Sequence, residues 1–148
     1  MFRDLNFPSF EFRIDRSGEK LLIFDVLRKK NVVLTPEEWV RQHMVRYLIE
    51  YRGYPKSLIR VEAGLKYDKL GKRSDILVYD HQGRPFMVIE CKSPEIKLDE
   101  NVLHQVATYS KSLETRYIGV SNGLKHYCWA VDIAHQRTSA LKDFPAYE

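Results

Sequence analysis

The stretch 86-FMVIECKSPE-95 joins an apolar strand directly to charged residues. Its first four residues, Phe86 to Ile89, predict a strand inside a sheet, and Pro94 prevents further strand pairing. Glu90 and Lys92 lie between this apolar run and Pro94. Their side chains share one face because side chains alternate along a strand. Since an unpaired buried charge is costly, this strand end is either an exit to the surface or a site.

A second acid lies one strand earlier in the sequence. Asp75 opens the apolar run 75-DILVYD-80, and the turn 81-HQGR-84 connects this run to the strand that ends at Glu90. A hairpin sets the start of one strand opposite the end of the next, so we expect Asp75 beside Glu90. Cross-strand neighbours lie within roughly 5–8 Å of each other.

Two carboxylates at this separation raise each other's pKa unless a cation lies between them. Hard oxygen ligands without a nearby His or Cys cluster favour Mg²⁺ or Mn²⁺. Lys92 is then placed to orient or deprotonate an attacking water, or to neutralise charge on a phosphate. Asp75, Glu90 and Lys92 thus predict metal-assisted phosphodiester hydrolysis. The alternative is a structural ion pair at a sheet edge.

The triplet Glu-x-Lys is a weak signal by itself, because Glu95-Ile96-Lys97 has the same pattern only five residues later. This second triplet follows a proline, in what we expect to be a solvated loop. The context of Glu90 and Lys92 therefore carries the prediction.

The surrounding pattern predicts a mixed α/β sheet. In chain order we expect a helix at 35–53 with Thr35 as its N-cap, strands at 57–68, 74–80 and 85–92, a helix from Asp99 to Leu113, and a hairpin of strands at 116–123 and 125–132. The first thirty residues predict a hairpin or two edge strands. The tail from Ile133 onward has little pattern.

Composition agrees with a single globular domain over residues 1–148. An apolar content of 44% and a charged content of 30% are typical of a soluble protein. We expect a cytoplasmic protein without a membrane segment, because the N-terminus has no apolar signal core and the apolar runs are short. The net charge of +4 is compatible with a polyanionic partner without being evidence for one.

Five motifs in order resemble a known family: 34-LTPEEWVRQ-42, 72-KRSDILVYD-80, 88-VIECKSP-94, 105-QVATY-109 and 121-SNG-123. Together they look like the PD-(D/E)xK nuclease superfamily, and in particular the N-terminal nuclease-type domain of type I restriction enzyme R subunits. This resemblance implies a restriction-endonuclease-like αβββαβ core at residues 33–132, with extra N-terminal strands at 1–32 and a C-terminal tail at 133–148.

The resemblance also implies roles for the strand-end residues. Asp75 and Glu90 would be metal ligands, the backbone carbonyl of Cys91 a third ligand, and Lys92 the catalytic lysine. Packing alone also accounts for Cys91, a small residue on the opposite side of the strand.

Residues on the helices would support this site. Gln105 and Tyr109 match a Gln-x-x-x-Tyr motif that supports the site and contacts nucleic acid in related nucleases, although packing alone also explains Tyr109. The first helix of the fold usually carries an acid near the site, and Glu37 is the better candidate. Glu38 stands where a capping box places an acid.

A basic segment comes just before Asp75. Lys72 and Arg73, with Lys66 and Lys69, would lie at the mouth of the site and hold phosphates by charge; a solvated loop is the ordinary alternative.

The predicted function is Mg²⁺-dependent hydrolysis of DNA by a nuclease-type domain, related to restriction or DNA processing. The R subunits of the family continue into a translocase motor, and this sequence has no Walker-type loop. A catalytically inactive nucleic-acid-binding or interaction module is therefore the alternative. Expected partners are DNA and either a second copy of the chain or a larger restriction or repair complex.

Overall fold

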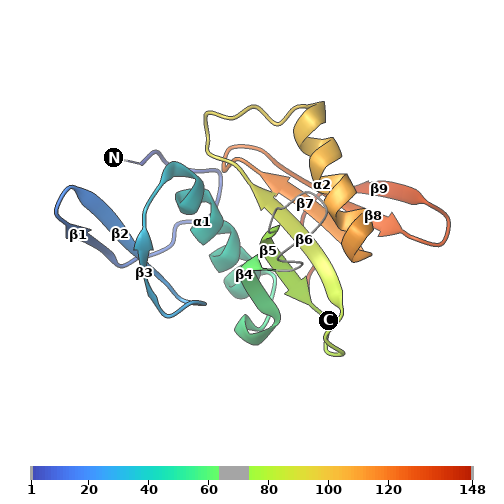
Figure 1. Cartoon of the computed structure of the whole chain (residues 1–148), viewed down its shortest axis with the longest axis horizontal. Coiled ribbons are helices and arrows are strands. Elements are labelled where there is room, and N and C mark those ends of the chain that lie inside the picture. The colour runs from blue at the N-terminus through green and yellow to red at the C-terminus, as the bar shows by residue number, and fades with distance from the viewer. Residues whose placement is uncertain (1, 64–73, 148) are drawn as a thin grey trace.

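Helix α1 (Pro36–Tyr51) lies between two β-sheets in the computed structural model, which describes residues 2–63 and 74–147 (Figure 1). The smaller sheet contains β1 (Ile14–Ser17), β2 (Lys20–Asp25) and β3 (Lys30–Val33). The larger sheet contains β4 (Ile59–Ala63), β5 (Ser74–Tyr79), β6 (Pro85–Cys91), β7 (Tyr117–Ser121), β8 (His126–Asp132) and β9 (Arg137–Leu141). A 3₁₀ turn at Lys56–Leu58 and helix α2 (Glu100–Leu113) complete the elements.

The larger sheet is mixed, with strand order β4-β5-β6-β7-β8-β9. Its neighbours pair antiparallel except β6 and β7, which run parallel. Parallel strands need a long crossover, and α2 provides it. The order α1, three strands, α2 and a further strand confirms the predicted restriction-endonuclease-like core, with extra strands before it.

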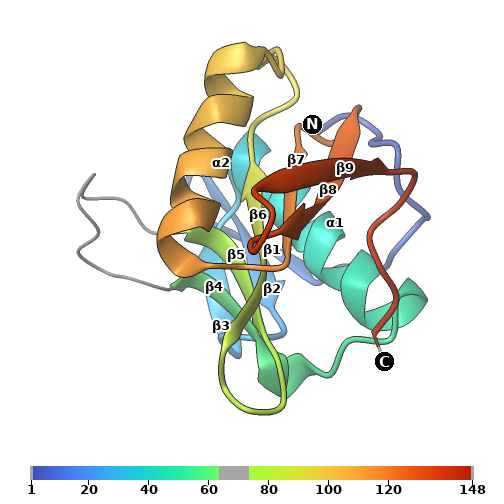
Figure 2. The same cartoon turned by 90° about the vertical axis from the view of Figure 1, so that its right-hand side faces the viewer.

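The two helices cover opposite faces of this sheet (Figure 2). On one face, Val40, Met44 and Leu48 of α1 pack with apolar residues of β5 and β6, namely Ile76, Val78, Met87 and Ile89. On the other face, Val106 and Leu113 of α2 pack with Leu77, Val88, Ile118 and Val120. Because side chains alternate along each strand, every central strand contributes to both cores.

The ends of both helices lie where the sequence predicts them. Thr35 caps α1, since its hydroxyl accepts a hydrogen bond from the Glu38 N–H, and the Asp99 carboxylate accepts one from the Val102 N–H at the start of α2. The helices contain 16 and 14 residues. Within the described residues, neither is long and apolar enough to cross a membrane.

Two terminal regions contain more structure than the sequence predicts. The N-terminal region forms three strands rather than two, because β3 pairs with β2. The segment after Ile133 includes β9, which pairs with β8, and Phe144, which is buried against Gly119. The segment with little sequence pattern thus contains a strand that the sequence does not reveal. Most residues of β3 and β9 are exposed, so these strands lack the apolar periodicity that reveals a strand.

Candidate functional site

Asp75 and Glu90 lie at adjacent ends of β5 and β6. The last register pair before them is Ile76 with Ile89, so the next position on each strand sets Asp75 opposite Glu90. The backbone N–H of Cys91 donates a hydrogen bond of 2.7 Å to Oδ2 of Asp75. This bond holds the aspartate against the end of β6.

Lys92 completes the cluster from the residue after β6. Its Nζ lies 3.1 Å from Oε2 of Glu90, and 26% and 22% of the two side chains are exposed. The backbone N–H of Lys92 donates to the carbonyl of Ser121, which fixes the chain beside β7. A charged pair thus stands at the edge of the apolar core, partly open to water.

The electrostatics of the cluster are dominated by its carboxylates. Burial and the neighbouring charge of Glu90 raise the pKa of Asp75 to about 7, although the Cys91 N–H and Arg41 oppose this shift. Burial disfavours the charged form of Lys92, but the charges of Glu90, Asp75 and Glu37 outweigh it and raise its pKa. Asp75 and Glu90 therefore form an acid pair whose mutual repulsion the surrounding protein compensates incompletely.

The thiol of Cys91 has a different environment from the charged residues beside it. Cys91 is completely buried in the core on the α1 face, and burial, followed by the charge of Asp75, raises its pKa. A thiol that resists ionisation is a poor nucleophile. Cys91 is therefore a core residue that offers the site only its backbone.

Helix α1 carries two adjacent acids, Glu37 and Glu38, whose environments differ. Burial and the charge of Asp75 raise the pKa of Glu37, while Arg41 and Lys92 oppose this shift. The charges of Asp75 and Lys92 therefore reach Glu37, in the first turn of α1.

The carboxylate of Glu38 belongs to a buried network instead. It accepts hydrogen bonds from Gln42 at 2.9 Å and Arg28 at 3.2 Å, and it lies 3.5 Å from Nε of Arg41. Asp25, at the end of β2, in turn binds Arg28 and Gln42. Glu38 therefore does more than occupy a capping position. The sequence offers one local signal for this network, the four-residue spacing of Glu38 and Gln42.

The remaining predicted residues are placed only in part. Gln105 is half-buried on α2, next to Val106, and Tyr109 is one turn later on the same helix. The side chain of Tyr109 lies outside the described part of the structure. The same holds for all of Lys66, Lys69, Lys72 and Arg73. The expectation of a basic segment at the mouth of the site thus remains a prediction.

The donor set of the strand ends fits a hard divalent cation. Asp75 and Glu90 supply carboxylate oxygens, and the Cys91 carbonyl faces β5 like its N–H, because both groups of a strand residue point to the same neighbour. Two carboxylates and a carbonyl leave positions for water and phosphate oxygens, as Mg²⁺ prefers. Across the described residues, no cluster of three or more His, Cys, Asp or Glu side chains has metal-site geometry. A cation here would therefore rely on two side chains and the main chain.

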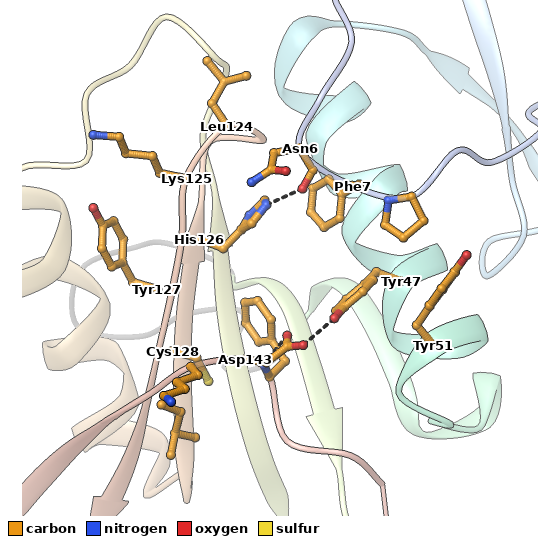
Figure 3. Close-up of a pocket in the computed structure, with 14 residues that line it drawn as sticks. Asn6, Phe7, Tyr47, Tyr51, Leu124, Lys125, His126, Tyr127, Cys128 and Asp143 are labelled. Carbon is orange, nitrogen blue, oxygen red and sulfur yellow. Dashed lines mark hydrogen bonds between the residues drawn. The ribbon is translucent and has the colours of Figure 1, made fainter.

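A separate groove of about 710 Å³ lies beside α1, between its C-terminal half and β8 (Figure 3). Tyr47 donates a hydrogen bond of 2.6 Å to Asp143 in it, and the His126 ring contacts the Asn6 carbonyl at 2.7 Å. Its lining residues include none of the strand-end cluster. The groove and the acid pair are thus distinct features.

The order of helices and strands, with two helices on opposite faces of a mixed sheet, defines a restriction-endonuclease-like α/β domain. The family model described as "Type I restriction enzyme R protein N terminus" matches residues 36–145. The chain belongs to this family.

A solved structure has a similar fold. It is a fragment described as an HsdR subunit of a type I restriction enzyme from Vibrio vulnificus YJ016, with a TM-score of 0.52 and 19% sequence identity. The match covers 76% of this chain and 24% of that chain. At this identity the likeness concerns the fold alone. A search of the curated proteins gave no match.

Proposed function

We propose that this domain is a metal-dependent nuclease of the PD-(D/E)xK type that hydrolyses DNA phosphodiester bonds. The observation that carries the proposal is the meeting of Asp75, Glu90 and Lys92 at the ends of two paired strands. The family of the chain supplies the restriction context and hence DNA as the substrate. We place it in the cytoplasm, as part of a restriction complex.

Each residue of the cluster has a role that its environment supports. Asp75 and Glu90, with the Cys91 carbonyl, would hold Mg²⁺ or Mn²⁺. When bound, the cation would lower the pKa of a water molecule and polarise a phosphate oxygen. Lys92 is partly exposed beside Glu90, so its ammonium reaches the solvent side where a phosphate would lie. There it would stabilise charge that develops on the phosphate.

Glu37 and the two α2 residues would act around this centre. Glu37 is in the first turn of α1, where the charge of Asp75 raises its pKa, and it would accept a hydrogen bond from metal-bound water. Gln105 and Tyr109 would contact the nucleic acid, and Lys72 and Arg73 would hold its phosphates. These assignments rest on the family motif and on the position of each residue in the chain.

The experiment is cleavage of supercoiled plasmid DNA with Mg²⁺, Mn²⁺ or EDTA. The wild-type chain should nick or cut the plasmid only with metal, and Asp75→Asn and Glu90→Ala should each remove this activity while circular dichroism shows an intact fold. Cleavage that persists in both variants would exclude the site. DNA binding without any metal-dependent product from the wild-type chain would instead indicate a binding module.

A further inference from the structure

Two aromatic side chains form an exposed stack on β8. The rings of Tyr127 and Trp129 are nearly parallel, with an interplanar angle of 17° and centroids 6.0 Å apart. Tyr127 is 40% exposed, and Trp129 is partly exposed. Aromatic surface of this kind is available to a ligand because the core does not fully cover it.

The stack lies on the same face of the sheet as the acid pair. Glu90 pairs in register with Val120, and Val120 pairs with Tyr127, so the three residues form one row across β6, β7 and β8. Two strand spacings separate Glu90 from Tyr127, or about 10 Å. Val120, the middle residue of this row, is buried beneath α2. Glu90 and Tyr127 therefore flank the part of the sheet that α2 covers.

The surroundings of the stack are basic and open. Lys125 is exposed, and its side chain lies with that of Tyr127 on the side of β8 opposite to the His126 ring (Figure 3). On the β9 side, Trp129 pairs with the small residue Ala140. Lys142, also exposed, is one position beyond the Cys128–Leu141 pair and is therefore opposite Tyr127.

We propose that Tyr127 and Trp129, with Lys125 and Lys142, bind unpaired bases of DNA on the same face of the sheet as the acid pair. A flat aromatic surface stacks on any base, and lysines on either side match the charge of the phosphates. The choice of DNA as the ligand rests on the proposed function. Binding of bases to the stack, however, does not require the metal.

The first test uses the fluorescence of Trp129. The chain has two tryptophans, so a Trp39→Phe variant leaves Trp129 alone as the reporter. Titration with a thymidine oligonucleotide in EDTA should quench this fluorescence to saturation, and a blunt duplex of equal length should quench it much less. Absence of quenching, or equal quenching by both DNAs, would overturn the proposal.

The second test keeps both tryptophans and compares two tyrosines. Tyr51 is 56% exposed and stacks on Tyr47 at 15°, but it belongs to α1, which covers the opposite face of the sheet, although both Tyr51 and Tyr127 border the groove of Figure 3. Tyr127→Ala should raise the Kd for a labelled single strand about 10-fold, or about 1.4 kcal/mol, measured by anisotropy in EDTA, because a base loses its stacking surface. Tyr51→Ala should leave the Kd unchanged.

An unchanged Kd in Tyr127→Ala, or an equal rise in both variants, would overturn the assignment of the stack to DNA. The outcome is separate from that of the plasmid assay. Metal-dependent cleavage with an unchanged Kd in Tyr127→Ala would contradict only the aromatic stack. Weakened binding in Tyr127→Ala without cleavage by the wild-type chain would support the stack and contradict only the nuclease assignment.

Discussion

The chain contains the same triplet twice within eight residues, and the two copies have opposite environments. In Glu90-Cys91-Lys92 the acid and the lysine form a partly buried ion pair beside Asp75, at the end of a core strand. In Glu95-Ile96-Lys97 all three residues are exposed, and a hydrogen bond from the Ser93 side chain lowers the pKa of Glu95. Strand pairing and a second acid therefore distinguish a candidate site from a surface loop, whereas the triplet by itself does not.

The largest expected difference between the triplets is in catalysis. Lys92→Ala should reduce the rate of metal-dependent DNA cleavage by roughly 10²–10³-fold, because it removes a charge that faces the phosphate. Lys97→Ala removes the same charge from the loop and should leave the rate within about 2-fold of wild type. Single-turnover cleavage of plasmid DNA measures both. Similar rates for the two variants would contradict the distinction between the triplets.

The next largest expected difference is in metal binding by the two glutamates, Glu90 and Glu95. A ligand that binds only the folded state stabilises it, by about 1.4 kcal/mol at tenfold excess over its Kd. We therefore expect Mg²⁺ to raise the Tm of the wild type and of Glu95→Gln by about 3–6 °C. The Tm of Glu90→Gln should not respond. Differential scanning fluorimetry without DNA makes this test independent of cleavage, and a Mg²⁺ response retained in Glu90→Gln would remove Glu90 from the ligand set.

The sequence predicts the acid pair because its signal is local to one hairpin. The apolar runs and the turn set the register of β5 and β6, and the register alone brings Asp75 to Glu90. The central elements are predictable for a similar reason, since α1, α2 and the buried strands have apolar faces of regular period. Long-range partners leave no such pattern. Nothing in the sequence around Glu38 shows that Arg28 binds it.

The peripheral strands show the same limit. Residues Arg137–Leu141 of β9 are mostly exposed, and what makes them a strand is pairing with β8. Pairing is a tertiary property, so propensity and periodicity miss it. The sequence does not reveal the stack of Tyr127 and Trp129 either, because alternation along a strand does not show which face is open.

A smaller effect, on stability, should follow when the loop of the second triplet loses its hydrogen bond to Asn122. Asn122 is buried; its amide donates to the Ile96 carbonyl at 2.8 Å and accepts from the N–H groups of Leu124 and Lys125. Asn122→Ala should lower the free energy of unfolding by about 1–3 kcal/mol, because these groups lose their partner. Urea denaturation measures the change, with the exposed Asn101→Ala as control.

The same variant sharpens the comparison of the triplets. The backbone of Lys92 is held by Ser121 rather than by Asn122, so Asn122→Ala should still cleave DNA at conditions where it is folded. Loss of cleavage in folded Asn122→Ala would show that the loop with the second triplet takes part in the site.

The smallest expected effect is a pH dependence of stability that comes from His126, which contacts Ser121 beside the first triplet. Ser121, whose carbonyl accepts the Lys92 N–H, contacts Nδ1 of His126 through its hydroxyl at 2.7 Å, and Nε2 of His126 lies 2.7 Å from the Asn6 carbonyl. The carbonyl can only accept, so Nε2 carries the proton and Nδ1 accepts from Ser121. Burial lowers the pKa of His126 below its usual 6.5, although the Asn6 carbonyl and Asp143 oppose this shift.

The sign of the effect follows from this direction. As the pH falls below about 6.5, the unfolded chain binds a proton at His126 before the folded chain does, so the stabilisation present above this pH is progressively lost. Wild type should therefore lose more unfolding free energy than His126→Gln between about pH 7.5 and about pH 5, whereas the exposed His104→Gln should behave like wild type. Urea denaturation at the two pH values measures the difference. Equal losses of unfolding free energy in wild type and His126→Gln would show that protonation of this histidine does not contribute to the pH dependence of stability.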